Sequence, residues 1–480
     1  MACNDRALYK ATGLFMNTHK RINTKRNDDR VVSNDMLIPF ILVAALFPLW
    51  GFANDITNPL VKAFKDIFLI SNTQSSLVQF AFYLGYGVMA IPAALFIRRF
   101  SYKYGIVLGL GLYAVGALLF IPASMYGEFN YFLAALCILT CGLALLETTA
   151  NPYILSMGSP QTATKRLNLA QAFNPLGSLL GMFVASNMIL NNLHVAKFRV
   201  EQKAAHPEYA QMLPSVVDGK LTDALQQFAV TNPVQHQVMQ SADLVTIRTP
   251  YVAIALVVIC LLFVYLFYRL PNTQLMASDK RDQALKPLFI KLINNKPYRE
   301  GVVAQVFYVG AQIMCWTFII HYGMAEVGLS AAEAQHFNII AMCFFLASRF
   351  LCTYLLNWFK AGLLLMWFAI AGASLMCLVV FIGGEVGLYS LVATSACMSL
   401  MFPTIYGIAL NGLKADASIA SAGLVMAIVG GALMPPLQGM IIDANPIAFL
   451  SAEQASFLLP MLCFVAITIF AYRVVFIHKQ

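Results

Sequence analysis

Long apolar segments alternate with short polar ones from Met36 to Ile477. A helix needs about 20 apolar residues to cross the hydrocarbon core of a bilayer, and many of these segments reach that length. They predict twelve membrane-spanning helices, at residues 37–57, 76–97, 104–123, 131–154, 168–191, 249–269, 300–321, 334–357, 362–383, 386–411, 417–441 and 456–477. The pattern therefore favours an all-α membrane protein.

The composition supports a membrane location. Of the 480 residues, 60% are hydrophobic and only 11% are charged, whereas soluble domains average about 25% charged residues. The ten cysteines fall almost entirely inside the predicted helices, which argues against a disulfide framework. Neither they nor the seven histidines have metal-ligand spacing, so we expect no metal and no organic cofactor.

The net charge of +9 has a topological explanation. Lys and Arg gather in alternate connections, at residues 6–30, 98–103, 165–166, 269–299, 360 and 414. The short connections on the other side hold only Lys62 and Lys65 as basic residues. Because basic loops stay in the cytoplasm, we expect both termini there and no nucleic-acid partner.

A basic segment in the middle of the chain separates six predicted spans from six others. The predicted segments are a cytoplasmic tail at residues 1–35, an N-terminal bundle at 36–191 plus 249–269, a long extracellular loop at 192–248, a cytoplasmic linker at 270–298 and a C-terminal bundle at 299–480. The tail lacks the apolar core of a cleavable signal peptide. Part of the long loop is expected to form a small extracellular cap.

Two carboxylates lie inside predicted spans, each about one helical turn before an Asn-Pro pair. The segments are Asp55-Ile-Thr-Asn58-Pro59 in the first span and Glu147-Thr-Thr-Ala-Asn151-Pro152 in the fourth. A charge at the bilayer centre costs about 2.5 to 3.5 kcal/mol, so such acids usually face an interior cavity and handle protons, ions or substrate. We interpret Glu147 and Asp55 as proton-coupling residues.

Each acid also has a structural interpretation. Glu147 is the only charge between Leu133 and Leu155, where burial favours a neutral carboxyl. A protonated acid there would exchange protons near neutral pH, or would simply hydrogen-bond two helices together. Asp55 lies near the extracellular end of its span, where an acid can be interfacial. We favour the coupling role for both.

Polar and aromatic side chains at helical spacing predict a sugar site. Three amides follow one another at three-residue steps in the fifth span, at Asn168, Gln171 and Asn174. Amides offer both donors and acceptors to a polyhydroxylated solute. Tyr308, Gln312 and Trp316 follow at four-residue steps in the seventh span, where an indole face suits the apolar CH face of a pyranose. Packing between helices is the structural alternative for both sets.

Prolines in two spans and one arginine in a third are further candidate residues. Phe402-Pro403 in the tenth span and Met434-Pro435-Pro436 in the eleventh predict broken or kinked helices that line a moving gate. Arg349 lies deep in the eighth span, and we interpret it as an anchor whose side chain snorkels to the cytoplasmic interface.

With these motifs in view, the chain resembles the fucose/proton symporter family of the major facilitator superfamily. The resemblance rests on Leu49-Trp50-Gly51-Phe52-Ala53-Asn54, Ala81-Phe82-Tyr83-Leu84-Gly85-Tyr86, Leu146-Glu147-Thr148-Thr149-Ala150-Asn151-Pro152, Arg166-Leu167-Asn168-Leu169-Ala170-Gln171 and Tyr308-Val309-Gly310-Ala311-Gln312. It runs through nearly all the spans. It implies a major facilitator fold, in which two six-helix bundles surround a central cavity.

The resemblance also implies functional residues. Glu147 matches the family's acid in the fourth span, whereas the family's first-span aspartate corresponds to Asn58 here, with Asp55 the nearest acid. Phe402 stands where the family pattern has a tyrosine. With the residue pattern above, the predicted sugar-binding residues are Asn58, Asn151, Gln171, Asn174, Gln312, Trp316, Tyr308 and Phe402.

We therefore expect a secondary active transporter, not an enzyme, that imports L-fucose or a related hexose with a proton by alternating access. A sodium-coupled or uncoupled carrier of glucose or galactose is the alternative within the same fold. A sugar sensor that does not transport is a third hypothesis, which the absence of a foldable domain in the tail disfavours. The expected partners are the sugar and the lipid bilayer, with the chain as a monomer in a bacterial inner membrane and no obligate protein partner.

Overall fold

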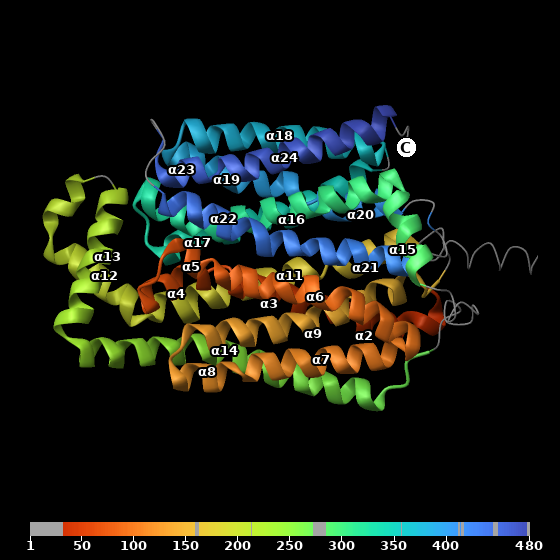
Figure 1. The fold of residues 1–480 in the computed structure, drawn as a ribbon, viewed down its shortest axis with the longest axis horizontal. Helices are drawn as coiled ribbons and strands as arrows, with labels where there is room; N and C mark the ends of the chain where they lie inside the picture. Colours follow the sequence, from red (N-terminus) through yellow and green to blue (C-terminus); the bar gives the residue numbers. More distant parts are fainter. Residues whose placement is uncertain are drawn as a thin grey trace, which may run out of the picture.

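The structure is a computed structural model that describes residues 32–158, 163–212, 214–271, 285–356, 358–410, 413, 417–444 and 450–477. These residues fold almost entirely into helices (Figure 1). Within them, twelve helical segments are long and apolar enough to cross a membrane. The prediction of a twelve-span all-α membrane protein is therefore confirmed.

The N-terminal half contains the first six spans. They are α2 (Leu37–Ala44), α3 (Phe47–Thr57) and α4 (Leu60–Phe68); α5 (Asn72–Ser75) and α6 (Leu77–Arg99); α7 (Tyr102–Leu118) and α8 (Phe120–Tyr126); α9 (Phe129–Leu155); α10 (Ala163–Gln171), α11 (Asn174–Val184), η3 (Ala185–Ile189) and η4 (Leu190–Asn192); and α14 (Pro233–Phe267). Two further helices, α12 (His194–Ala205) and α13 (Pro214–Thr231), precede the sixth span with the short η5 (Pro207–Gln211) between them.

The C-terminal half contains the other six. After α15 (Leu285–Asn294) come α16 (Lys296–Tyr322) and η7 (Gly323–Val327); α17 (Ala331–Leu355); α18 (Ala361–Phe381); α19 (Gly384–Met398) and α20 (Met401–Leu410); α21 (Ala417–Met426), η9 (Ala427–Val429) and α22 (Gly430–Asp443); and α23 (Ala452–Ser456), α24 (Leu458–Tyr472) and η10 (Arg473–Ile477).

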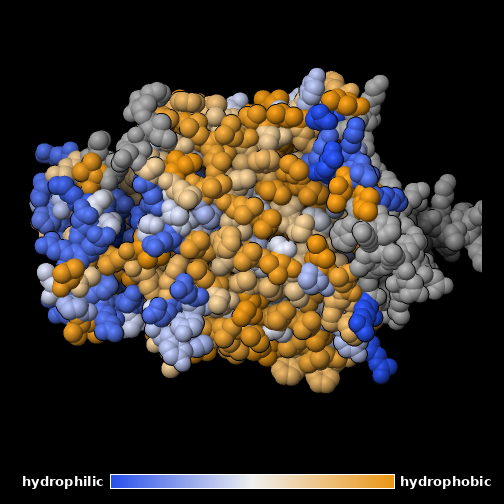
Figure 2. Space-filling view, viewed as in Figure 1, coloured by the Kyte–Doolittle hydropathy of each residue, from blue (hydrophilic) through white to orange (hydrophobic). Residues whose placement is uncertain are grey.

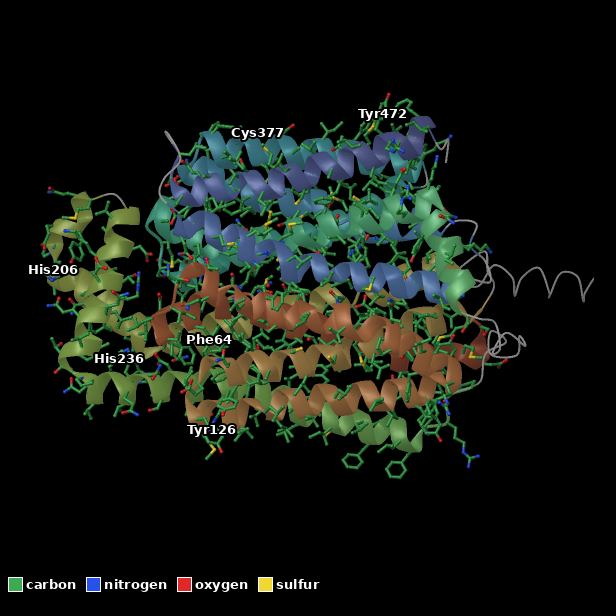
Figure 3. The ribbon with its side chains drawn as sticks, viewed as in Figure 1. Phe64, Tyr126, His206, His236, Cys377 and Tyr472 are labelled. Carbon is green, nitrogen blue, oxygen red and sulfur yellow. The ribbon has the colours of Figure 1, made fainter. Side chains whose placement is uncertain are left out.

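The two halves lie side by side with their long helices running along the length of the molecule (Figure 1). One end carries α12 and α13 and is called the cap end; the other carries α2, α15 and the end of α24 and is called the linker end. Figure 2 shows an apolar belt between two polar ends, which is the surface that a bilayer requires. In Figure 3, His206 lies on the cap and Tyr472 at the opposite end of the belt.

Glycines allow the helices that border the centre to approach closely. A Cβ built on Gly177 of α11 would overlap the carbonyl oxygen of Pro48 in α3, and one on Gly51 of α3 would overlap the carbonyl oxygen of Asn174. Small residues at such crossings let backbones touch without side chains between them. The first and fifth spans are thereby held against each other, which fixes the positions of Asp55 and Asn174 relative to one another.

Several spans are interrupted rather than continuous. In the tenth span, α19 ends at Met398 and α20 begins at Met401, just before Pro403. In the eleventh, the 3-10 turn η9 precedes α22, which holds Pro435 and Pro436 in its interior. The break in the tenth span lies just before Pro403, as predicted, since proline removes a helical donor and crowds the preceding turn. In the eleventh span the turn precedes the prolines, and α22 continues through both of them.

The first and sixth spans extend farther toward the cap end than the apolar pattern indicates. The first continues through α4 to Phe68, so Lys62 and Lys65 belong to a helix instead of a connection. The sixth begins at Pro233 instead of 249. Charged side chains are tolerated at these helix ends because they are paired there. A hydropathy pattern does not reveal such pairing, so it makes these spans too short.

An ionic network joins the cap helices to α4. Lys62 Nζ lies 3.3 Å from Asp66 and 3.6 Å from Asp218 of α13, and Arg199 of α12 pairs with both acids. Burial alone would raise the pKa of Asp218, but Lys62 and Arg199 hold the pKa of that carboxyl well below its ordinary value. The cap is therefore a folded part of the N-terminal half, and α13 also contacts η7 of the C-terminal half.

Candidate functional site

A central cavity of about 140 Å³ lies between the two halves. The residues that line it come from both: Phe47, Trp50, Asn54 and Asp55 of α3; Tyr83 and Tyr86 of α6; Glu147 of α9; Gln171, Asn174 and Ser178 of the fifth span; Tyr308, Val309, Gln312, Ile313 and Trp316 of α16; Met342, Phe345 and Arg349 of α17; Phe402 of α20; and Ile428 of η9. Holding a single water takes only about 10–15 Å³. The cavity therefore has room for several waters or a small solute.

Both predicted coupling acids face this cavity. Asp55 projects from α3 and Glu147 from α9, and they are the two carboxylates in its lining. Asp55 is 1% exposed, and its Oδ2 atom makes no hydrogen bond with a described residue. Two acids of separate helices thus meet at one cavity, as the repeated acid and Asn-Pro pattern indicates.

Asn58 forms a hydrogen bond with Asp55. Its Nδ2 donates to Asp55 Oδ1 at 2.8 Å. Its Oδ1 accepts from Gln79 Nε2 at 3.0 Å and from Thr317 Oγ1 of the other half at 3.4 Å. Asn58 is completely buried and is not part of the cavity lining. Asn58 therefore contacts Asp55 and does not line the cavity in this structure.

Asn151 also lies outside the lining. It follows Glu147 by about one turn on α9, is 1% exposed, and its Oδ1 makes no hydrogen bond with a described residue. Neither amide of the two Asn-Pro pairs therefore lines the cavity in this structure. The side chain of Asn168, which begins the amide series of the fifth span, is outside the described residues.

The amides of the fifth span do reach the cavity. Gln171 ends α10 and Asn174 begins α11, and both line the cavity together with Ser178. Asn174 Nδ2 donates a long hydrogen bond of 3.4 Å to Phe47 O of α3. Ser178 continues the same helical stripe by four residues, so the spacing that revealed Gln171 and Asn174 also points to it.

The seventh span presents its aromatic residues and an amide to the same space. Tyr308 donates to Met398 O at 3.1 Å, and the indole Nε1 of Trp316 donates to Ser395 Oγ at 3.0 Å. Their polar atoms are thus already bonded to α19, while the rings line the cavity. Gln312 lies between them and makes no hydrogen bond with a described residue. Its amide is available to a solute.

Residues 42–196 match the family model of the Major Facilitator Superfamily. The "L-fucose-proton symporter" of Haemophilus influenzae is 51% identical to this chain over 92% of it and 98% of that protein. This chain belongs to the L-fucose-proton symporter family of the major facilitator superfamily. A "Glucose/galactose transporter" of Brucella abortus is 30% identical over 88% of this chain and 91% of that protein.

A solved structure agrees with this family assignment. The crystal structure of the transporter FucP in the outward conformation superposes with a TM-score of 0.69, at 33% identity over 91% of this chain and 98% of that chain. The expectation of a major facilitator fold with two six-helix bundles is confirmed. The relatives are transporters and not enzymes, as expected from the sequence.

Tyr83, Asn54 and Arg349 also line the cavity, although they are not among the predicted sugar ligands. Tyr83 donates to Asn54 Oδ1, so that α6 and α3 share one polar contact at the cavity wall. Asn54 is one residue before Asp55, and its place in the resemblance motif was the signal for it. Arg349 was expected to be an anchor at the cytoplasmic interface.

Arg349 instead faces the cavity. Its Nη1 donates to Gln171 O of the N-terminal half and its Nη2 to Ser399 O, each at 3.5 Å. Its guanidinium lies 5.0 Å from the centroid of the Phe345 ring. A cation held over an aromatic face and between two carbonyls costs less to bury than a free one. Its position deep in the span was the sequence signal for this role.

Phe402 of α20 closes the aromatic side of the cavity. Its ring centroid lies 6.2 Å from that of Tyr308, within the range of edge-to-face aromatic pairs. A phenylalanine offers a ring but no hydroxyl. The cavity wall at this point therefore offers an apolar face and no hydrogen-bonding group.

Proposed function

We propose that this protein imports L-fucose, or a hexose closely related to it, together with a proton by alternating access. The observation that carries the proposal is the meeting of Asp55 and Glu147 with Gln312 and Trp316 at one cavity between the halves. The 51% identity to a protein named as an L-fucose-proton symporter supports the choice of sugar and coupling ion. No cofactor beyond the proton is invoked.

The cavity supplies what a sugar and a proton each need. The amides of Gln171, Asn174 and Gln312 offer donors and acceptors to hydroxyls, and the ring of Trp316 offers an apolar face to the CH face of a pyranose. A carboxyl enclosed by such walls is more stable neutral than charged. Binding of the proton and binding of the sugar therefore each raise the affinity for the other, because both stabilise the enclosed cavity.

Asp55 is proposed as the first-span coupling acid, since it lines the cavity while Asn58 lies behind it. The bond from Asn58 to Oδ1 leaves Oδ2 for a proton or a hydroxyl. In this arrangement Asn58 serves Asp55 as an orienting donor. Its further bond to Thr317 of α16 makes the position of Asp55 sensitive to the relative placement of the two halves.

The protein is proposed to lie in a bacterial inner membrane as a monomer, with the linker end in the cytoplasm. The basic connections support this orientation, because Lys and Arg are retained on the cytoplasmic side. The cap helices then face the outside. In this structure the cap end is bridged between the halves, so admission of a sugar from outside requires α13 to part from η7 and α5 to part from α22.

The test uses vesicles that contain the protein, without a membrane potential or a pH gradient. L-fucose, L-galactose, D-arabinose, D-galactose, D-glucose and D-mannose are added in turn while the external pH is recorded. The expected result is alkalinisation with L-fucose, and its loss in Glu147→Gln but not in Glu128→Gln, which changes an exposed acid at the cap end. Entry of labelled L-fucose without any pH change would refute proton coupling.

A carrier of glucose or galactose is the second candidate. It is favoured by the 30% identity to the glucose/galactose transporter of Brucella abortus and by Phe402, which offers no hydroxyl where the family pattern has a tyrosine. Alkalinisation with D-galactose or D-glucose but not with L-fucose would select this candidate. Uptake that needs sodium instead would identify a different coupling ion.

A further inference from the structure

A second cavity, of about 330 Å³, lies at the linker end between the two halves. Its walls come from α6 of the N-terminal half and from α15, α16 and α21, which lie together at that end in Figure 1. Leu95, Ile293 and Val303 at its rim are 39%, 58% and 50% exposed. We call this cavity the seam groove, because it opens to the lipid-facing surface along the seam of the halves.

The seam groove is apolar and offers water no partners. Ala422, Gly423 and Met426 of the eleventh span line it together with the aliphatic side chains of α6 and α16. The hydroxyl of Tyr298 is already used, since it donates to Ala420 O at 2.9 Å. Apolar cavities without free polar groups stay dry or take up apolar ligands. A hydrocarbon chain is therefore the matching occupant.

The depth of the groove corresponds to one leaflet. Leu95 precedes the end of α6 at Arg99 by four residues, and Val303 follows the start of α16 at Lys296 by seven. At about 1.5 Å per residue these rim positions lie about 6 and 10 Å inside the helix ends. One leaflet of a bilayer has about 15 Å of hydrocarbon. The groove thus faces the acyl chains of the leaflet at the linker end.

Cationic side chains lie at the linker end of the groove, where the headgroup of such a lipid would be. Arg299 lines the mouth of the groove and is exposed, and its guanidinium has no partner among the described residues. Arg99 and Lys296 are exposed at the adjoining helix ends. Basic side chains beside an apolar cleft at the cytoplasmic side attract anionic lipid headgroups, at about 1 kcal/mol each near the surface.

We propose that the seam groove binds one anionic phospholipid, with an acyl chain between α6 and α21 and its phosphate at Arg299. Assignment to the cytoplasmic leaflet rests on the orientation proposed above. Because α6 belongs to one half and α21 to the other, a chain lodged between them binds this arrangement of the halves and not one in which they have parted at the linker end. The lipid therefore favours this conformation by its differential affinity.

The test counts lipids bound to the full-length protein in detergent by native mass spectrometry, with phosphatidylglycerol and phosphatidylcholine of identical chains as probes. Val303→Phe fills the groove from α16, and Arg299→Gln removes the headgroup contact. The matched controls are Val257→Phe, at a 49% exposed position of α14, and Arg269→Gln, at the exposed linker end of the same span. Binding in detergent does not depend on orientation, on the sugar or on proton coupling.

The expected result is one saturable phosphatidylglycerol site with a preference over phosphatidylcholine of at least about fivefold, the factor that a single headgroup cation supplies. Arg299→Gln should lower the preference by about that factor, Val303→Phe should remove the site, and the two controls should change neither. The proposal is overturned if Arg269→Gln lowers the preference as much as Arg299→Gln does. It is equally overturned if the folded Val303→Phe protein keeps the site, or if the wild type binds the two lipids alike. Should Val303→Phe fail to fold, Arg299→Gln decides alone.

Discussion

Neutralising Asp443 should open the cap end of this transporter. Asp443 ends α22 in the C-terminal half, and its carboxylate bridges to the start of α5 in the N-terminal half. Oδ1 accepts from Asn72 N at 3.0 Å and from Asn72 Nδ2 at 2.8 Å, and Oδ2 accepts from Thr73 N at 2.7 Å and from Thr73 Oγ1 at 2.5 Å. Four donors of one half thus converge on one charge of the other.

The size of the effect follows from these bonds. A hydrogen bond to a charged group contributes about 1.5–3 kcal/mol when it is sheltered, and Asp443 is exposed, which puts each bond at or below the lower limit. Asp443→Asn keeps one acceptor oxygen for Asn72 and turns an amide NH₂ toward the donors of Thr73. We expect a net loss of about 1.5 kcal/mol, which shifts the equilibrium about tenfold toward the open cap end.

The assay is the distance between spin labels at two exposed positions of the cap end, Glu128 in the N-terminal half and Glu385 in the C-terminal half, measured by pulsed electron paramagnetic resonance. The native cysteines are replaced first. Asp443→Asn should add or enlarge a long-distance population. Asp223→Asn is the control, since it neutralises an exposed acid of α13 that takes part in no ion pair among the described residues.

Two outcomes would refute this reasoning. If Asp443→Asn leaves the distance distribution unchanged, the four bonds do not hold the halves together. If Asp223→Asn lengthens the distances equally, the response comes from the general charge of the cap and not from the bridge between α22 and α5.

Three further predictions concern the cavity and the cap. Glu147→Gln should keep sugar exchange but abolish uphill uptake, because an amide cannot release a proton. Counterflow of labelled sugar measures exchange, and accumulation against a gradient measures uphill uptake. Loss of exchange together with sugar binding would argue against Glu147 as the proton carrier. Trp316→Ala should raise the apparent sugar KM by about twofold to tenfold without moving its pH profile, as aromatic contacts contribute about 0.5–1.5 kcal/mol. The lipid-facing Trp367→Ala should change neither. Lys62 and Arg199 depress the pKa of Asp218. The cap network should therefore be intact at neutral pH and weaken below about pH 4, as Asp218 is protonated. The mobility of a spin label on α13 should rise below that pH, and Asp218→Asn should make the mobility pH-independent.

Much of the architecture is a local property of the sequence. Hydropathy along the chain predicts all twelve spans, because each span needs its own apolar surface whatever its neighbours are. Helical spacing also predicts shared faces, and Tyr308, Gln312 and Trp316 all line the cavity. A buried acid near an Asn-Pro pair signals an interior site, and both Asp55 and Glu147 are found there.

The direction of individual side chains is not a local property. Asn58 and Asp55 are neighbours on one helix, yet packing against Gln79 and Thr317 turns the amide away from the cavity and leaves the acid facing it. Arg349 faces the cavity because Gln171, Ser399 and the ring of Phe345 surround its guanidinium. The partners lie on other spans, so a single-helix pattern does not reveal which side chain they will accommodate.

Contacts between the halves were decided only by the tertiary structure. Asp443 and Asn72 are 371 residues apart. Within the N-terminal half, the pair between Lys62 and Asp218 likewise connects a span to a segment that the sequence presents as a loop. The seam groove likewise exists only where α6 and α21 meet. Apolar periodicity determines which residues leave water, whereas the pairing of charges and the shape of cavities depend on how the finished helices pack.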